Sequence, residues 1–336
     1  MPTDPLDLTI CATCGTQFST PSPPPLCKIC DDPRQYVPPT GQAWTTLRTL
    51  QQSNPTYRNI FTPDPIHGEK LIAIQTEPKH AIGQRAYLCR TQTPIPLSSQ
   101  QPPSTGQPPK EEPTFNILWD CLTYIDEKTI SRINELGGIH AIVISHPHYY
   151  TTHLIWAETF NCPVYLSAED EEWVCIRGDR QRFFTEGELG LSPALLSVSG
   201  SQEGLEGRAE TELDILVIKT GGHFPGSTVL LWKSLRTLLI ADTIAVVPSG
   251  RYWVGRPEGT ASFTFMWSYP NMIPLSADDV LGIWKAIQHT DFEITRGAFA
   301  GMDTDTDSKK RLLDSAKIFV KAMGYLDHAI HQEECL

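Results

Sequence analysis

The stretch Ser145-His-Pro-His-Tyr-Tyr-Thr-Thr-His153 follows the apolar residues 141–144, which predict a buried strand. Three histidines therefore crowd the loop in which that strand ends. Because alternate residues of an extended chain point the same way, His146 and His148 can converge on one point. Two imidazoles that converge at a strand end indicate a metal site, and a pair of polar loop histidines is the simpler alternative. Matching residues further along the chain favour the metal.

Two later segments supply those residues. The sequence Thr220-Gly-Gly-His-Phe-Pro-Gly-Ser227 lies between apolar strands predicted at 213–218 and 228–232, and its glycines permit a tight turn that presents His223. A further strand, predicted at 238–243, ends in Asp242, which either caps a turn or binds the metal. Three histidines and one aspartate are a usual ligand set for zinc, with room for a water molecule.

In this order of motifs the chain resembles the metallo-β-lactamase-fold hydrolases, over roughly residues 40 to 325. The first motif of that family is His-x-His-x-Asp-His at a strand end; a glycine-flanked His and a strand-end Asp follow. The resemblance implies that four residues bind a metal: His146, His148, His223 and Asp242. It also implies an α+β fold, a four-layer αββα sandwich of two sheets between helices.

The chain departs from the family pattern at three positions. Tyr150 stands where the family has Asp, and Thr151 stands where it has the adjacent His. No His follows the late strand predicted at 292–295, where the family has its last ligand. The sequence therefore predicts one catalytic metal, not two. His153 begins a helical pattern and is either a substitute ligand or proton carrier, or a surface residue at the start of the helix.

A second motif lies near the N-terminus, where Cys11-Ala-Thr-Cys14 and Cys27-Lys-Ile-Cys30 are two Cys-x2-Cys pairs. This spacing is typical of a four-cysteine structural zinc site, and two disulfides are the less favoured alternative. Four thiolates fill the shell, so this zinc has no open position for chemistry. We predict that four of the other cysteines are small core residues and that Cys335 lies in the tail.

The composition limits the possible partners. The 336 residues include 27 Lys and Arg and 39 Asp and Glu, a net charge of −12 that disfavours nucleic acid and anionic membranes. The N-terminus has no basic or apolar segment of a signal peptide, and no apolar run approaches the roughly 20 residues that span a bilayer. Together with the free cysteines, this predicts a cytoplasmic location and a small-molecule substrate.

We expect three parts: a zinc ribbon at 1–40, a metallo-β-lactamase-like domain at 41–327 and a tail at 328–336. Residues 91–114 contain seven prolines and predict a flexible surface insertion within the domain. Strands followed by alternating strands and helices suit two sheets sandwiched by helices.

Two groups of residues flank the predicted site. Asp120 ends a strand predicted at 116–120 and either supports the metal loop or is a satisfied structural carboxylate. Aromatic residues between 252 and 269 are either core or an apolar wall for a hydrophobic or aromatic substrate.

These features predict metal-assisted hydrolysis, with a metal-bound hydroxide attacking a lactam, lactone, thioester or other ester. Asp242 would hold the water or bind the metal, and Tyr150 or His153 would protonate the leaving group. Iron suits the same ligands as zinc. The alternatives are a non-catalytic interaction protein of this fold and a mononuclear iron oxygenase.

Overall fold

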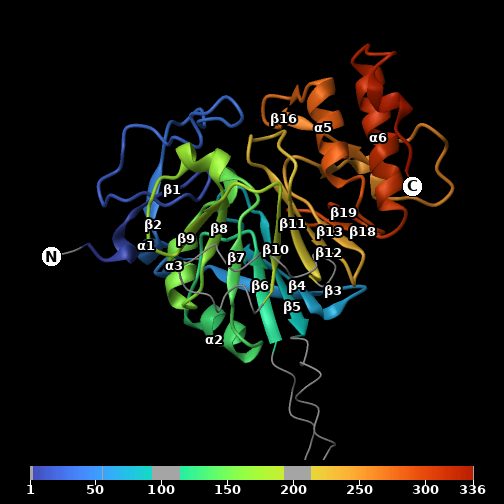
Figure 1. The fold of residues 1–336 in the computed structure, drawn as a ribbon. Helices are drawn as coiled ribbons and strands as arrows, with labels where there is room; N and C mark the ends of the chain where they lie inside the picture. Colours follow the sequence, from blue (N-terminus) through green and yellow to red (C-terminus); the bar gives the residue numbers. More distant parts are fainter. Residues whose placement is uncertain (1–2, 55, 93–113, 193–212, 336) are drawn as a thin grey trace, which may run out of the picture.

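The computed structural model describes residues 3–54, 56–92, 114–192 and 213–335. Two β-sheets lie face to face at the centre, and helices cover their outer faces (Figure 1). The first sheet has the order β3-β4-β5-β6-β7-β8-β9 and the second has the order β10-β11-β12-β13-β18-β19. This is the four-layer αββα sandwich that the sequence predicts.

The first sheet consists of β3 (Arg58–Asp64), β4 (Gly68–Glu77), β5 (Arg85–Gln92), β6 (Thr114–Trp119), β7 (Ala141–Val143), β8 (Val164–Ser167) and β9 (Gln181–Phe184). The second consists of β10 (Glu188–Leu191), β11 (Ile215–Lys219), β12 (Thr228–Trp232), β13 (Thr237–Leu239), β18 (Ile294–Arg296) and β19 (Asp303–Thr304). The main helices are α1 (Leu47–Gln51), α2 (Glu127–Glu135), α3 (His153–Thr159), α5 (Ala277–Ile287) and α6 (Ser308–Ala322). The short paired strands are β1 (Thr9–Cys11), β2 (Trp44–Thr46), β14 (Ala245–Val246), β15 (Phe263–Thr264), β16 (Met266–Ser268) and β17 (Ile273–Pro274).

The period of two along each strand divides the apolar side chains among separate cores. In β5, Tyr87 and Cys89 lie between the two sheets, whereas Leu88 faces α2 and α3. In β12, Leu230 lies between the sheets and Leu231 faces α5 and α6. Because both faces of these central strands are buried, they are continuously apolar in sequence, as expected for a sheet covered on both sides.

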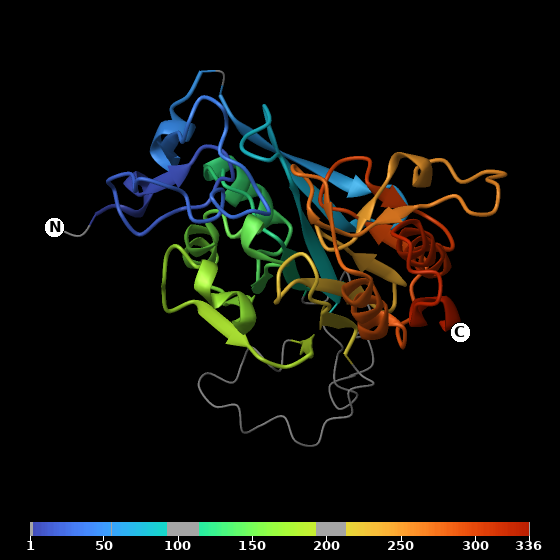
Figure 2. The same cartoon turned by 90° about the horizontal axis from the view of Figure 1, so that it is seen from above.

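The N-terminal four-cysteine module, residues 3–46, is joined closely to the body. Its strand β1 pairs with β2, so the pairing crosses the predicted boundary at residue 40. Ile10 and Cys27 of the module share one hydrophobic core with Leu122 and Trp156 of the sandwich. Figure 2 shows the module beside the loops near α3. The module therefore packs as part of the molecule.

Two further predicted segments are the insertion at 91–114 and the tail at 328–336. Most of the predicted insertion, residues 93–113, lies outside the described residues, while its flanks pair as Gln92 with Thr114. The predicted tail is folded: Ile330 is fully buried in the core beside α5 and α6, and Trp284 donates a hydrogen bond to Glu333 (3.1 Å). Within the described ranges, no helix has both the length and the apolarity needed to cross a membrane.

A buried ion pair joins the two sheets. Arg296, the last residue of β18, contacts Asp64, the last residue of β3, and each side chain is only 2% exposed. The Arg296 guanidinium also contacts Asp305 at the surface (2.7 Å). Burial would raise the pKa of Asp64, but Arg296 and the main-chain N–H groups of Ile66 and His67 outweigh it, and this pKa lies below its usual value.

We expect Asp64→Asn to lower the free energy of unfolding by about 3 kcal/mol, because it leaves Arg296 buried without its main charged partner. Asparagine keeps the bonds to the main-chain N–H groups of Ile66 and His67. Because the folded-state pKa of Asp64 is depressed, the pair contributes fully at neutral pH. The difference between wild type and variant should shrink as the pH falls through that pKa.

The measurement is urea unfolding at several pH values, with Asp291→Asn as the matched control. Asp291 forms an exposed pair with Arg236, whose side chain is 52% exposed, so this change should leave the unfolding free energy nearly unchanged. Equal effects of the two substitutions would contradict the structural role of the Asp64–Arg296 pair.

Candidate metal centre

Loops from both sheets meet at the candidate metal centre. His146 and His148 follow β7 of the first sheet. His223 lies in the connection between β11 and β12, and Asp242 follows β13, both in the second sheet. The four residues that the resemblance assigns as ligands therefore come together although they span 97 positions of the chain, from 146 to 242.

The carboxylate of Asp242 lies at the middle of this cluster. Its Oδ2 atom is 3.3 Å from His146 Nε2, 3.4 Å from His148 Nδ1 and 3.8 Å from His223 Nε2. All four candidate ligand atoms lie within 4.8 Å of one another. The three histidines are at most 2% exposed and Asp242 is 8% exposed. Three nitrogens and one oxygen thus converge in a site that is nearly closed to water.

Neighbouring groups hold these rings in place. His146 Nδ1 lies 2.9 Å from the Ser145 hydroxyl, and His223 Nδ1 lies 3.0 Å from the main-chain carbonyl of Met266. The Tyr149 hydroxyl donates a 2.6 Å hydrogen bond to Asp242 Oδ1. Such outer contacts fix which nitrogen of each imidazole faces the centre, and they are typical of metal sites.

Two glycines allow the His223 loop to approach the centre closely. Gly222 has a φ of +92°, and a Cβ there would lie 2.5 Å from Thr243 Oγ1, the hydroxyl that contacts the His223 N–H. A Cβ at Gly226 would lie 2.7 Å from Asp170 Cγ, whose carboxylate accepts a hydrogen bond from the Gly226 N–H. Side chains at these two positions would push the loop, and His223 with it, away from Asp242.

The protonation states suit a cation. Burial lowers the pKa of His148 to about 4 and that of His223 well below its usual range, so both rings are neutral at pH 7. Burial would raise the pKa of Asp242, but the surrounding histidines outweigh it, His146 foremost, and this carboxyl is ionised. The Nε2 atom of His146, which faces Asp242, is buried without a hydrogen-bond partner. Three imidazoles around an ionised carboxylate are the donor set of a zinc or iron ion, so a metal fits these residues.

The loop geometry differs from the extended chain that the sequence suggests. His146 itself is extended, with φ −171° and ψ 172°, but Pro147–Tyr149 forms a 3₁₀ turn that begins at the proline. Residues three apart lie above one another in such a turn, and the rings of His146 and Tyr149 are 4.5 Å apart. Tyr149 thereby reaches Asp242, a role that the sequence analysis missed.

The two predicted proton donors, Tyr150 and His153, lie outside the cluster. The Tyr150 hydroxyl donates to the main-chain carbonyl of Asp170 (3.2 Å), because the 3₁₀ turn rotates it away from the cluster. His153 is not a surface residue: it is 1% exposed, and its two ring nitrogens contact the Tyr150 carbonyl (2.6 Å) and Gln181 Nε2 (2.7 Å). Neither Tyr150 nor His153 belongs to the convergent cluster.

For Asp120 and for the aromatic residues between 252 and 269, parts of both alternative roles are seen. Asp120 Oδ1 accepts a hydrogen bond from the Ser145 N–H (2.8 Å), so it supports the metal loop, and burial raises its pKa to about 7. Phe263 and Phe265 are core residues, whereas Tyr252 is 65% exposed. Tyr269 lies at the centre: its ring is 6.0 Å from that of His223, and its buried hydroxyl has no hydrogen-bond partner.

Two residues of the N-terminal module also reach the centre. Gln35 Nε2 lies 3.3 Å from His148 Nδ1, and Arg34 Nε donates a 2.7 Å hydrogen bond to the main-chain carbonyl of His223. No local motif in the sequence indicates this, because the contacts join residues more than 110 positions apart.

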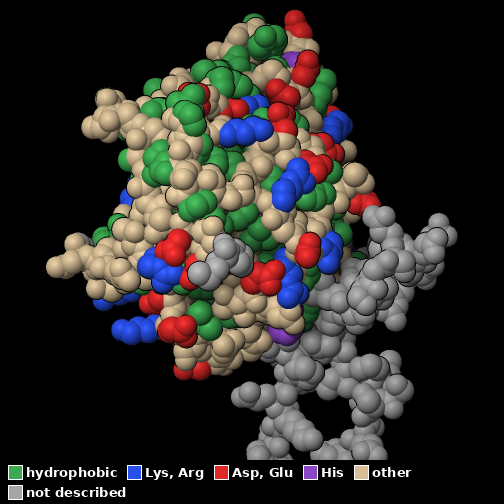
Figure 3. Space-filling view, turned by 90° about the vertical axis from the view of Figure 1, so that its left-hand side faces the viewer, with side chains coloured by type: hydrophobic (Ala, Val, Ile, Leu, Met, Phe, Trp, Pro, Cys, Tyr) green, Lys and Arg blue, Asp and Glu red, His purple; other side chains and the backbone are tan. Residues whose placement is uncertain are grey.

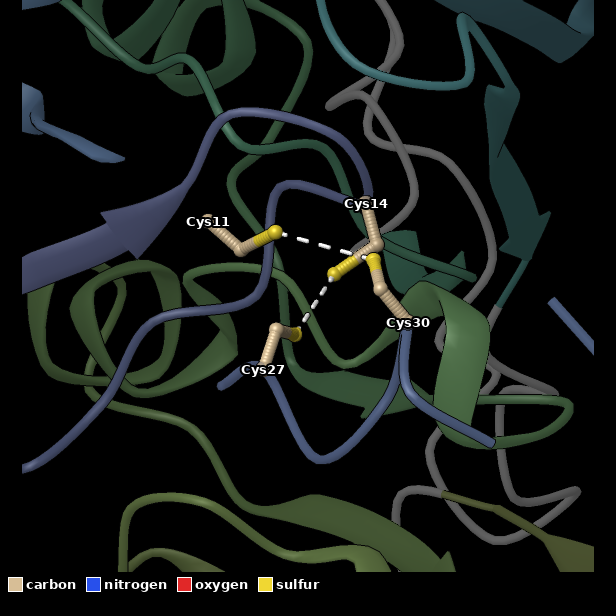
Figure 4. Close-up of side chains that lie close together, drawn as sticks. All are labelled: Cys11, Cys14, Cys27 and Cys30. Carbon is tan, nitrogen blue, oxygen red and sulfur yellow. Dashed lines mark hydrogen bonds between the residues drawn. The ribbon is translucent and has the colours of Figure 1, made fainter. Parts of the chain in front are cut away.

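The four cysteines of the module form a second convergent cluster (Figure 4). The Sγ atoms of Cys11 and Cys30, and those of Cys14 and Cys27, are each 3.6 Å apart, and all four thiols are free and buried. A tetrahedral zinc with Zn–S distances of about 2.3 Å separates its sulfurs by about 3.8 Å, whereas a disulfide requires about 2.05 Å. The spacing therefore fits a four-thiolate metal site and not a pair of disulfides.

Comparison with known proteins agrees with this fold. The model of the metallo-beta-lactamase superfamily matches residues 111–306. An uncharacterized protein of Bacillus subtilis (strain 168), YmaE, is 36% identical over 319 residues, which cover 94% of this chain and 96% of YmaE. The mono-zinc form of the metallo-β-lactamase FIM-1 from Pseudomonas aeruginosa is 12% identical, with 79% of this chain and 96% of FIM-1 covered and a TM-score of 0.44. The chemotaxis sensor ODP, in a peroxy diiron state, is also 12% identical, with 79% and 99% covered and a TM-score of 0.43. The chain belongs to the metallo-β-lactamase superfamily.

Proposed function

We propose that this protein is a metal-dependent hydrolase that acts on the carbonyl group of a lactam, lactone, thioester or other ester. The observation that carries the proposal is the convergence of three buried imidazoles on the ionised carboxylate of Asp242. When bound there, a zinc ion supplies an activated water and polarises a carbonyl oxygen. Membership of a superfamily of metal-binding proteins supports this reaction class.

The chain's own residues would perform three tasks. The histidines at 146, 148 and 223 hold the metal through the nitrogens that face Asp242. Tyr149 fixes the Asp242 carboxylate through its 2.6 Å hydrogen bond. The unpartnered Tyr269 hydroxyl is available to donate a hydrogen bond to a substrate oxygen, and burial keeps its pKa well above its ordinary value, so it stays protonated at neutral pH.

The surroundings of the centre support an apolar or aromatic substrate. Phe224 is fully buried and its ring lies 5.0 Å from that of His148 and 5.3 Å from that of His223. Two exposed apolar side chains lie further out: Met272 is 80% exposed and Tyr36 is 48% exposed. Each is next in sequence to a residue near the centre, Met272 to Asn271 and Tyr36 to Gln35, and the Asn271 amide donates a hydrogen bond to the Gln35 carbonyl. Apolar side chains around a few directed polar groups are typical of small-molecule sites.

Charge and thiol chemistry support a small-molecule substrate in a reducing compartment. On the face that carries the N-terminal module, Lys and Arg side chains are interspersed with acidic ones and form no basic patch (Figure 3). A mixed surface with a net charge of −12 disfavours nucleic acid. None of the nine cysteines is placed in a disulfide, which is the usual state in the cytoplasm.

The full-length protein should contain two metal ions, one in each cluster. His223→Ala should remove one equivalent and Cys27→Ser the other, because each substitution deletes one of four ligands. Elemental analysis by mass spectrometry measures both the stoichiometry and the metal. Zinc in both sites supports the hydrolase, and iron that is lost with His223→Ala would favour an oxygenase. One equivalent in the wild type, retained in His223→Ala, would contradict a metal at the His/Asp cluster.

The two neighbouring tyrosines give a matched test of the site geometry. Tyr149→Phe removes the hydrogen bond to Asp242 and should lower kcat on a chromogenic ester or lactam by about tenfold or more. Tyr150→Phe removes only a bond to a main-chain carbonyl and should change kcat by less than about threefold. The reverse order of effects would restore Tyr150 as the proton donor that the sequence suggests and would contradict the assignment of Tyr149.

A further inference from the structure

The segment that follows the last cysteine of the module runs directly into the metal centre. Cys30 lies in the four-sulfur cluster, and Gln35, five residues later, is only 8% exposed and has its amide nitrogen 3.3 Å from His148 Nδ1. A turn between them is closed by a hydrogen bond from the Gln35 N–H to the Asp32 carbonyl (2.9 Å). The two clusters are therefore linked through a short, hydrogen-bonded piece of chain.

Arg34 anchors this connecting segment, residues 31–35, to the loop that carries His223. Its guanidinium lies over the rings of Phe224 (4.5 Å), Trp267 (4.8 Å) and Trp173 (5.5 Å). One nitrogen of the same group, Nη1, donates to both carboxylate oxygens of Asp32 at 3.0 Å each. Cation–π contacts of a largely buried arginine are stronger than those at an exposed surface. Phe224 follows the candidate ligand His223, so Arg34 ties the module to the ligand loop itself.

The opposite side of the piece of chain is held by the turn between β16 and β17. The Ser268 hydroxyl donates to the Arg34 carbonyl (2.9 Å), and the Asn271 amide donates to the carbonyls of Pro33 (3.0 Å) and Gln35 (3.1 Å). Main-chain carbonyls on consecutive residues are thus satisfied by the sandwich. Gln35 is placed by contacts on both sides and does not lie at the centre by chance.

A metal would change the partner of the Gln35 amide. His148 Nδ1 faces Asp242 and His223, and it has one lone pair, which cannot serve a metal and an amide donor together. With the metal bound, the amide must find another acceptor or remain an unsatisfied buried donor, which costs about 1–3 kcal/mol. A substrate oxygen at the centre is an acceptor of the right kind.

We propose that Gln35 is a substrate-orienting residue whose amide donates a hydrogen bond to the substrate's oxygen, and that the four-cysteine metal site is a required part of the active site because it holds Gln35 in place. This inference rests on the proposed hydrolase function and names a contact of the same site. It revises the view of the module as a purely structural zinc site.

The test compares Gln35→Ala with Gln51→Ala in the full-length protein. Gln51 is the matched control, because its amide also donates to an acceptor within the fold, the Ile125 carbonyl (2.8 Å), away from the centre. Ester hydrolysis gives kcat and KM, and acetate serves as a carboxylate probe whose affinity is read from the d–d bands of the cobalt-substituted protein. Cobalt-substituted His223→Ala provides the spectrum of the four-cysteine site for subtraction.

We expect Gln35→Ala to lower kcat/KM about tenfold or more and to weaken acetate binding about fivefold or more, with both metals and the acetate-free spectrum unchanged. Gln51→Ala should behave as the wild type. A Gln35→Ala protein with wild-type kcat/KM and acetate affinity would overturn the proposal. If the wild type hydrolyses no ester, the proposed function fails, while the acetate affinities still decide the role of Gln35.

Cys27→Ser tests the dependence on the module. It should keep the metal at the His/Asp cluster and reproduce the loss in Gln35→Ala, and the double variant should be no worse than Cys27→Ser alone, because both changes remove the same contact. Circular dichroism verifies that the variant is folded, and Arg34→Met, which keeps all four thiols, is the second variant with the same expected loss. Wild-type activity in folded Cys27→Ser or in Arg34→Met would overturn the required role of the module.

Discussion

Three buried imidazole nitrogens facing one buried carboxylate form the constraint on which the rest of the structure depends. The nitrogens lie 3.3 to 3.8 Å from one oxygen of Asp242, and the four side chains are at most 8% exposed. Such a group is unfavourable unless a cation takes up the lone pairs and the charge. The tight 3₁₀ turn after β7, the glycines around His223 and the hydrogen bond from Tyr149 all serve to bring these four atoms together.

The sandwich supports this convergence by fixing two sheets against each other. The candidate ligands come from both sheets, so any sliding between the sheets would open the cluster. The interlayer core and the buried pair of Arg296 and Asp64 resist that motion. Arg296 ends the late strand after which the family has its last ligand, and its guanidinium is engaged in ion pairs. The end of this strand is thus occupied by structural ion pairs.

The sequence predicts local features well, since they depend on near neighbours. The strands β7 and β13 and the convergence of the two Cys-x2-Cys pairs follow from apolar periodicity and spacing. The turn that begins at Pro147 was not predicted, and the contact of Tyr149 with Asp242, which depends on this turn, was therefore missed. The contact of Gln35 with His148 depends on how the module docks across the sandwich, which no local pattern encodes. For the same reason no local pattern encodes the packing of Ile330 against α5 and α6.

The most direct measurement of the central claim is zinc K-edge X-ray absorption of the full-length protein. If one zinc lies among Cys11, Cys14, Cys27 and Cys30 and the other among His146, His148, His223 and Asp242, the average zinc has about two sulfur neighbours at ~2.3 Å and about two nitrogen or oxygen neighbours at ~2.0 Å, with the outer-shell scattering of imidazole. A spectrum of four sulfur neighbours alone, in protein that retains all of its bound metal, would contradict a metal at the three-histidine centre.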